Sequence, residues 1–160
     1  METKDQVKHL APGEGKALWV VGDLVTLKVV GKDTEGAFAL AEVVSLPGGG
    51  PPSHIHHHED EIFCVLEGEY EFLVGERVNR ASAGSVIYGP RSISHNFKNV
   101  GTTPASMLAF VMPAGLEEFL EEVGEVATDK SSPPPFGQEE IGRLLAAAPK
   151  YGIEILTPSG

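Results

Sequence analysis

The sequence has little of what several classes of protein need. Cys64 is its only cysteine among 160 residues, so the chain cannot form the internal disulfides of a stapled secreted domain. No apolar run approaches the roughly 20 residues of a membrane-spanning helix. The first 16 residues are rich in charge and lack the apolar segment of a secretory signal. We therefore expect a cytoplasmic protein with no membrane partner.

Basic residues are also scarce. Lysine and arginine total 12 against 23 aspartates and glutamates, and the formal net charge is -11. Because a strongly acidic surface repels phosphate groups, we expect no nucleic-acid partner. The length suits one domain, and an apolar fraction of 41% is ordinary for a globular protein with a single core.

Turn-forming residues are abundant, with 19 glycines and 12 prolines. They separate many short segments rich in β-branched and aromatic residues, and residues 31–36 are typical of a turn. Gly22 is expected to form a bend. Closely spaced short strands indicate an all-β sandwich or barrel. The predicted strands lie within 18–30, 36–46, 54–56, 61–68, 69–75, 84–90, 94–100 and 105–113.

The pattern changes after Pro113. Leu116, Phe119 and Leu120 recur at helical spacing, as do Ile141 and Leu144 further on. The sequence therefore predicts a β-barrel domain over residues 1–112 and a helical extension over residues 113–160 that packs on it. Five glutamates are expected to form a solvated helix face. They are Glu117, Glu118, Glu121, Glu122 and Glu125.

Four of the six histidines fall within residues 54–58. His54 and His56 are two apart and would share one face of a strand. Glu61 begins the next strand, and His95 lies in another strand after a glycine and proline turn. Three imidazoles and a carboxylate suit a divalent first-row transition metal ion: Fe, Mn, Co, Ni, Cu or Zn. Four protein ligands leave a coordination position open, as a catalytic metal requires.

A histidine-rich tract also binds metal loosely without function, and this alternative stays open. His57 alternates away from His54 and His56, whereas His58 shares their face but falls at the turn. For both, the alternatives are direct ligation, support of a ligand, or exposure to solvent. His9 lies alone in a polar segment and is expected to be exposed.

The residues around this tract resemble the two motifs of the cupin superfamily. The first motif matches at Gly48, His54, His56, Glu61 and Gly68. The second matches at Gly84, Pro90, His95 and Asn99. Ser92 departs from the pattern, because the family usually has glycine there. The two motifs span residues 48–99, and residues 36–72 and 150–156 further resemble single-domain bacterial proteins described as similar to quercetin dioxygenases.

The resemblance implies a fold and a metal site. The fold would be a double-stranded β-helix, the jelly-roll cupin barrel, here with two short C-terminal α-helices. The metal ligands would be His54, His56, Glu61 and His95. Cupins commonly form dimers, so a homodimer is expected.

The reaction that follows from this resemblance is that of a metal-dependent dioxygenase. Its substrate would be an enolic or phenolic, flavonol-like small molecule, and Glu61 would also serve as general base. Inward-facing apolar residues are candidates for the substrate pocket, although plain barrel core is the simpler role for each. They are Phe63, Phe72, Phe97, Met107 and Phe110.

Two other function classes remain open. One is a non-catalytic barrel that binds or senses a small molecule and holds a structural metal. The other is a non-redox isomerase or lyase that uses the metal as a Lewis acid, for which zinc would serve as well as iron. Fold alone does not separate these classes.

Overall fold

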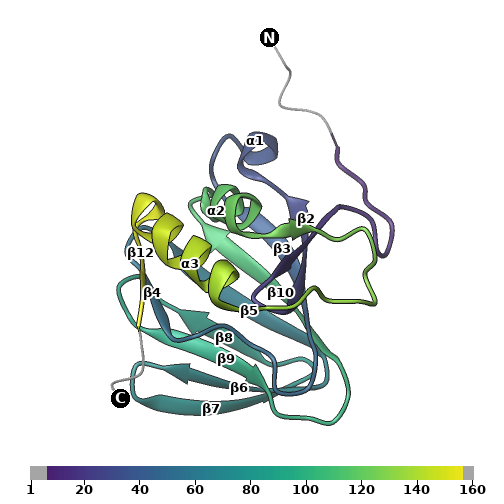
Figure 1. The fold of residues 1–160 in the computed structure, drawn as a ribbon, viewed down its shortest axis with the longest axis vertical. Helices are drawn as coiled ribbons and strands as arrows, with labels where there is room; N and C mark the ends of the chain where they lie inside the picture. The colour runs from purple at the N-terminus through teal and green to yellow at the C-terminus, as the bar shows by residue number, and fades with distance from the viewer. Residues whose placement is uncertain (1–6, 157–160) are drawn as a thin grey trace.

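Two antiparallel β-sheets face each other in the computed structural model, which describes residues 7–156 (Figure 1). The seven-stranded sheet has the spatial order β11 (Glu125–Val126), β1 (Lys16–Val20), β2 (Asp23–Val29), β3 (Ala39–Ser45), β10 (Ala105–Met112), β5 (Asp60–Glu67) and β8 (Val86–Gly89). The five-stranded sheet has the order β12 (Ile153–Ile155), β4 (His54–His56), β9 (His95–Asn99), β6 (Glu69–Val74) and β7 (Arg77–Ser82). The predicted all-β jelly roll is confirmed.

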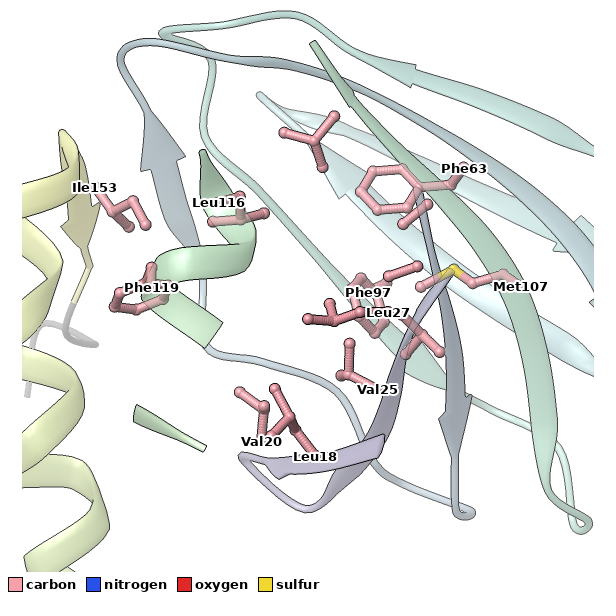
Figure 2. Close-up of a cluster of buried hydrophobic side chains, with 14 of the residues drawn as sticks. Leu18, Val20, Val25, Leu27, Phe63, Phe97, Met107, Leu116, Phe119 and Ile153 are labelled. Carbon is pink, nitrogen blue, oxygen red and sulfur yellow. The ribbon is translucent and has the colours of Figure 1, made fainter. Parts of the chain in front are cut away.

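The core fills the space between the sheets, because alternate residues of each strand point inward. On β10, Met107 and Ala109 are buried while their neighbours are half-exposed. On β6, Tyr70 and Phe72 are completely buried. Figure 2 shows Phe97 and Met107 among these packed side chains. Burial of each large apolar side chain contributes about 1.5–3 kcal/mol.

The segment after Pro113 joins both sheets as well as covering them. Its helices are α2 (Leu116–Val123), α3 (Gln138–Ala147) and the 3-10 helix η1 (Ala148–Tyr151). β11 pairs with β1, and β12 pairs with β4. The two helices were expected, whereas both strands were missed because each is too short to show a pattern. No helix within residues 7–156 has the length and apolar character to cross a membrane. The division at residue 112 stays a prediction.

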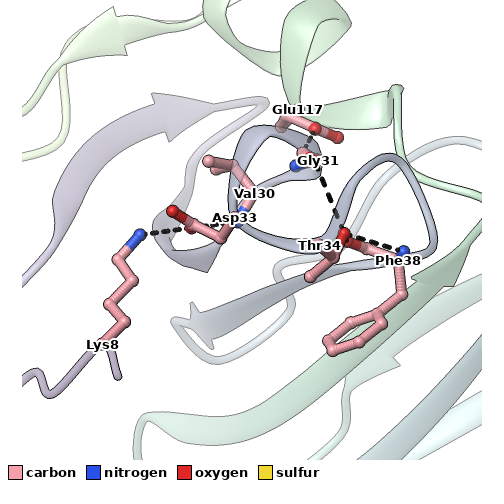
Figure 3. Close-up of polar contacts among 7 residues, drawn as sticks. All are labelled: Lys8, Val30, Gly31, Asp33, Thr34, Phe38 and Glu117. Atoms are coloured by element: carbon pink, nitrogen blue, oxygen red, sulfur yellow. Dashed lines mark hydrogen bonds and ion pairs between the residues drawn. The ribbon is translucent and has the colours of Figure 1, made fainter. Parts of the chain in front are cut away.

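A short helix, α1 (Gly31–Thr34), occupies the segment that was expected to be a simple turn. The Val30 amide donates to the Asp33 carboxylate over 3.0 Å, and the Lys8 ammonium donates to the same carboxylate over 2.6 Å (Figure 3). The carboxylate therefore caps the helix that it belongs to.

Glu117 corrects one sequence prediction. It was expected on a solvated helix face, but its side chain is buried and accepts hydrogen bonds from the amides of Gly31 and Gly115, both over 2.7 Å (Figure 3). Glu118 and Glu121 are exposed as predicted. The buried carboxylate ties the start of α2 to α1 and so holds α2 in place over the barrel.

Ser92 adopts a left-handed backbone conformation, with φ at 67°. Its amide donates to the His56 carbonyl over 2.7 Å, which links the turn before β9 to the end of β4. A positive φ costs little for glycine and more for residues with a Cβ. This conformation explains why glycine is usual at the position and shows that serine occupies it under strain.

We predict that Ser92→Gly raises the free energy of unfolding by about 1 kcal/mol, because glycine removes the left-handed strain. Urea unfolding at neutral pH measures the change. Ser94→Gly is the matched control, since Ser94 lies in the same turn without a positive φ and should lose stability on substitution. Equal effects of the two substitutions would contradict the strain at Ser92.

Candidate metal centre and its cavity

Four side chains converge between the two sheets at one end of the barrel. His54 and His56 come from β4, His95 comes from β9, and Glu61 reaches them from β5 in the opposing sheet. His54 and His95 are direct partners in the β4–β9 register. One ligand atom from each of the four residues lies within 4.8 Å of all the others. The structure thus brings together the set that the sequence pattern singled out, which we call the quartet.

The quartet has the contacts of groups that face a common point. Glu61 Oε2 lies 2.6 Å from His95 Nε2 and 3.4 Å from His56 Nε2, yet neither Oε2 nor His95 Nε2 has a hydrogen-bond partner. Buried polar atoms are ordinarily hydrogen-bonded. Atoms that bind one ion point at the ion instead of at each other, so these short, unaligned contacts fit a divalent metal.

Hydrogen bonding leaves one ring nitrogen of His54 available. Its Nδ1 lies 2.8 Å from the Pro52 carbonyl, which only accepts, so Nδ1 donates and Nε2 carries the free lone pair. Outer hydrogen bonds of this kind orient metal-binding imidazoles.

The protonation states also suit a metal ion. Burial, together with neighbouring imidazoles, lowers the pKa of His54 to about 4. Burial alone would raise the pKa of Glu61, but the imidazoles of His56 and His95 outweigh it and lower that pKa to about 2. At neutral pH the structure therefore holds a neutral imidazole and an ionised carboxylate, the forms in which these groups bind metals.

Glu59 is a residue that the sequence analysis missed. It is buried, and its Oε2 lies 3.5 Å from His56 Nδ1. Burial lowers the pKa of His56, but the carboxylates of Glu61 and Glu59 outweigh this and hold it above its ordinary value. Glu59 therefore lies beside Nδ1 of His56, the ring nitrogen remote from Glu61, and its charge favours the protonated imidazole. Nothing in the sequence separates it from an ordinary turn residue.

His57 and His58 do not join the quartet. Both are exposed, and His57 Nε2 lies 3.2 Å from Glu154 Oε2 of β12. The His58 ring packs against Gly152, where an added Cβ would come within 2.6 Å of it. These two histidines thus contact the C-terminal segment, and neither lies with the quartet.

The quartet opens into a cavity with apolar walls. The sheets contribute Val25, Ala109 and Phe97, and the C-terminal segment contributes Phe119 and Ile153. Figure 2 shows Phe119 and Ile153 near Leu116, at one side of the cluster of buried side chains. Among the described residues that line the cavity, only Asp23 and the quartet have polar side chains. Such a chamber suits a largely apolar ligand.

The five candidate pocket residues separate into two groups. Phe63 and Phe97 line the cavity. Phe72 and Met107 are completely buried in the core but are not part of the cavity wall. Phe110 is half-buried on the outer face of β10, because strand alternation turns Ala109 and Val111 inward instead. The cavity in the structure thus excludes Phe72, Met107 and Phe110.

Asp23 is the second polar residue that the sequence analysis missed. It is 4% exposed, and its Oδ1 has no hydrogen-bond partner among the described residues. Burial raises its pKa to about 7, against the opposing effect of a hydrogen bond with Ser45. In the sequence it follows Gly22 and is indistinguishable from the acidic residues common in surface turns.

Comparisons with known proteins agree with this geometry. The family model described as Cupin domain matches residues 41–111. A protein from Streptomyces cyaneus named polyketide synthase CurC is 33% identical over 144 residues, which cover 86% of this chain and 88% of that protein. Oxalate oxidase GF-3.8 from Triticum aestivum is 37% identical over 102 residues, covering 56% of this chain.

A solved structure shares the fold. It is described as a predicted oxalate decarboxylase from Thermotoga maritima, with a TM-score of 0.62 and 20% identity over 66% of this chain and 99% of that one. The chain spans 35% to 43% of the length of several curated relatives, the wheat protein included. Their activities are therefore no more than a guide to this chain.

We predict that the metal-free protein binds one Fe(II), Mn(II), Ni(II) or Zn(II) ion per chain, measured by calorimetry under argon. The double substitution His54→Ala/His95→Ala should abolish binding, because it removes two of the four converging ligands. The matched control His57→Ala/His58→Ala should keep it. Equal loss in both variants would mean that the metal binds a loose histidine tract.

We also predict that Asp23 makes the protein less stable as pH rises. Its folded-state pKa of about 7 lies above the ordinary 3.8, so the folded state retains a proton that the unfolded state has released. Between about pH 4 and pH 7 the free energy of unfolding should therefore fall, by up to about 4 kcal/mol.

Urea unfolding across this pH range tests the effect. Asp23→Asn should remove the decline, because the amide does not titrate. The control Asp129→Asn changes an exposed carboxylate and should leave it in place. A decline that persists in Asp23→Asn would show that another group is responsible.

Proposed function

The chain belongs to the cupin family, and we propose that it is a metal-dependent enzyme acting on an enolisable, largely apolar small molecule. The observation that carries this proposal is the quartet of His54, His56, Glu61 and His95 set in the wall of an apolar cavity. A purely structural metal site is normally closed by its ligands, whereas this one adjoins a chamber for a ligand.

The quartet and the cavity walls have complementary roles in this proposal. A divalent ion held by the four side chains would supply Lewis-acid activation, which lowers the pKa of an enol or phenol oxygen. The apolar walls exclude water and orient the carbon skeleton. Glu61 is ionised at neutral pH and is the proposed proton acceptor, with the imidazoles of His56 and His95 beside it.

The proposed substrate is of the phenolic or poly-β-carbonyl type. The relative that aligns over most of both chains is named a polyketide synthase, and polyketide chains carry repeated, readily enolised carbonyl groups. Proton transfer and ring closure on such a molecule need a base and a polarised oxygen but no oxidant. A non-redox reaction of this kind is therefore the proposed activity.

A metal-dependent dioxygenase, acting on a flavonol-like substrate, is the second candidate. The 37% identity to a protein named oxalate oxidase over 102 residues favours an oxidative reaction, and the flavonol-like substrate is what the sequence resemblance to quercetin dioxygenase-like proteins implies. Both candidates begin with an enol or phenol at the quartet. They differ in whether O₂ is consumed and in whether zinc can replace iron.

One experiment separates the candidates. Protein loaded separately with Fe(II) and Zn(II) is incubated with quercetin and with a synthetic poly-β-carbonyl thioester, under argon and under air, and products are analysed by mass spectrometry. Loss of water from the thioester under argon, with either metal, supports the non-redox proposal. Addition of O₂ to quercetin, only in air and only with iron, supports the dioxygenase. No turnover with either metal would overturn both and favour the binding-protein alternative.

We predict that Glu61→Gln retains metal but lowers turnover by about 100-fold or more, because the amide oxygen still coordinates but does not accept a proton. Turnover is measured at equal metal content, verified by atomic absorption. Glu67→Gln, an exposed change on the same strand, is the control. Wild-type turnover in Glu61→Gln would rule out the base role.

The expected homodimer and the cytoplasmic location stay predictions. The metal's identity is also open, because a set of three imidazoles and one carboxylate suits several first-row ions.

A further inference from the structure

The polar groups of the cavity occupy two separate places. Glu61 pairs with Val111, which pairs with Ala39 at the start of β3. Asp23 contacts Ser45 at the other end of β3. These ends are six residues apart, or about 20 Å of extended strand. The cavity wall between them is apolar.

The backbone around Asp23 is strained in a way that sets its position. Asp23 follows a two-residue turn in which Val21 and Gly22 both have positive φ, 52° and 83°. A β-branched residue rarely adopts this conformation, and such outliers concentrate at functional sites. Gly49 leaves room for the carboxyl group, since an added Cβ there would lie 3.2 Å from Asp23 Oδ1.

The carboxyl group at this position has unused hydrogen-bonding capacity. Asp23 is buried and its Oδ1 has no partner, while the Ser45 hydroxyl also lies within hydrogen-bond distance of the Tyr70 hydroxyl, at 3.2 Å. A buried orphan atom of this kind is costly unless something satisfies it. A ligand in the cavity that Asp23 lines can do so.

We propose that Asp23 is a substrate-binding residue whose carboxylic acid donates a hydrogen bond to a carbonyl or hydroxyl oxygen at the end of the substrate remote from the quartet. The cavity then selects an elongated molecule with an apolar body and an oxygen function at each end. This inference rests on the proposed function, because it assumes that the other end lies at the quartet.

The described side chains packed around Asp23 do not titrate near neutral pH, so a change in hydrogen-bond donation there is assigned to Asp23. Loop 46–53 has no titratable side chain, and Glu42 of β3 alternates away from the inward-facing Ser45. Burial raises the pKa of Tyr70 to about 12, so Tyr70 stays neutral. The quartet provides the other titratable groups in the cavity wall.

The test compares two probes that share a phenol and differ at the far end. They are 4-acetyl-4′-hydroxybiphenyl and 4-isopropyl-4′-hydroxybiphenyl, whose binding to the full chain is measured by calorimetry at about pH 5.5 and pH 8.5. Because both present the same phenol to the quartet, titration there cancels in the affinity ratio. Wild type should prefer the acetyl probe by roughly tenfold at the lower pH, the worth of one hydrogen bond. The preference should disappear at the higher pH, where Asp23 has lost its proton.

Two variants make the result decisive. Asp23→Asn should keep a preference that no longer depends on pH, because its amide still donates. Asp23→Leu should have no preference, and if it does not fold, the pH dependence of wild type against Asp23→Asn decides alone. An unchanged ratio in Asp23→Leu, the same pH dependence in Asp23→Asn, or no binding of either probe would overturn the proposal.

The measurement needs neither a bound metal nor turnover. Metal-dependent turnover without the acetyl preference would overturn this inference alone. The preference without any turnover would overturn only the proposed function.

Discussion

The approach of the Glu61 carboxylate to His56 and His95 across the gap between the sheets is the constraint on which the site depends. It places an ionised carboxylate in a buried setting, which is costly unless positive or coordinating groups compensate it. The imidazoles lie on β4 and β9 of one sheet and the carboxylate on β5 of the other, so the barrel must close with the observed register for the four to meet. The packing of the two sheets therefore also sets the geometry of the quartet.

The far end of the barrel is held by a separate set of buried hydrogen bonds. Asn99 donates to the carbonyls of Ser45 and Thr103, both over 2.9 Å, and the Gly101 amide donates to its side-chain oxygen over 2.9 Å. Tyr70 donates to the Ala105 carbonyl over 3.0 Å. These bonds satisfy the polar groups of strand ends and loops that would otherwise be buried without partners. They also fix Ser45, which in turn contacts Asp23.

The C-terminal segment extends both sheets and supplies part of the cavity wall. Its strands β11 and β12 extend both sheets, and α2 is anchored to α1 through Glu117. Phe119 and Ile153 then form part of the cavity wall. The shape of the cavity thus depends on residues far from both cupin motifs, so the motifs alone do not set which ligand fits.

The sequence by itself indicated the strand alternation and an all-β sandwich or barrel, and its resemblance to the two cupin motifs implied the jelly roll and the quartet. The alternation follows from local spacing: His54 and His56 share a strand face because side chains alternate with a period of two. Only the tertiary structure decided the roles of Asp23, Glu59 and Glu117, because each depends on partners remote in the chain or on burial that no local pattern encodes. The same holds for the cavity wall, where Phe63 and Phe97 are included and Phe110 is not. A residue's place in that wall depends on how two sheets and a C-terminal segment pack together, and periodicity within one strand does not carry that information.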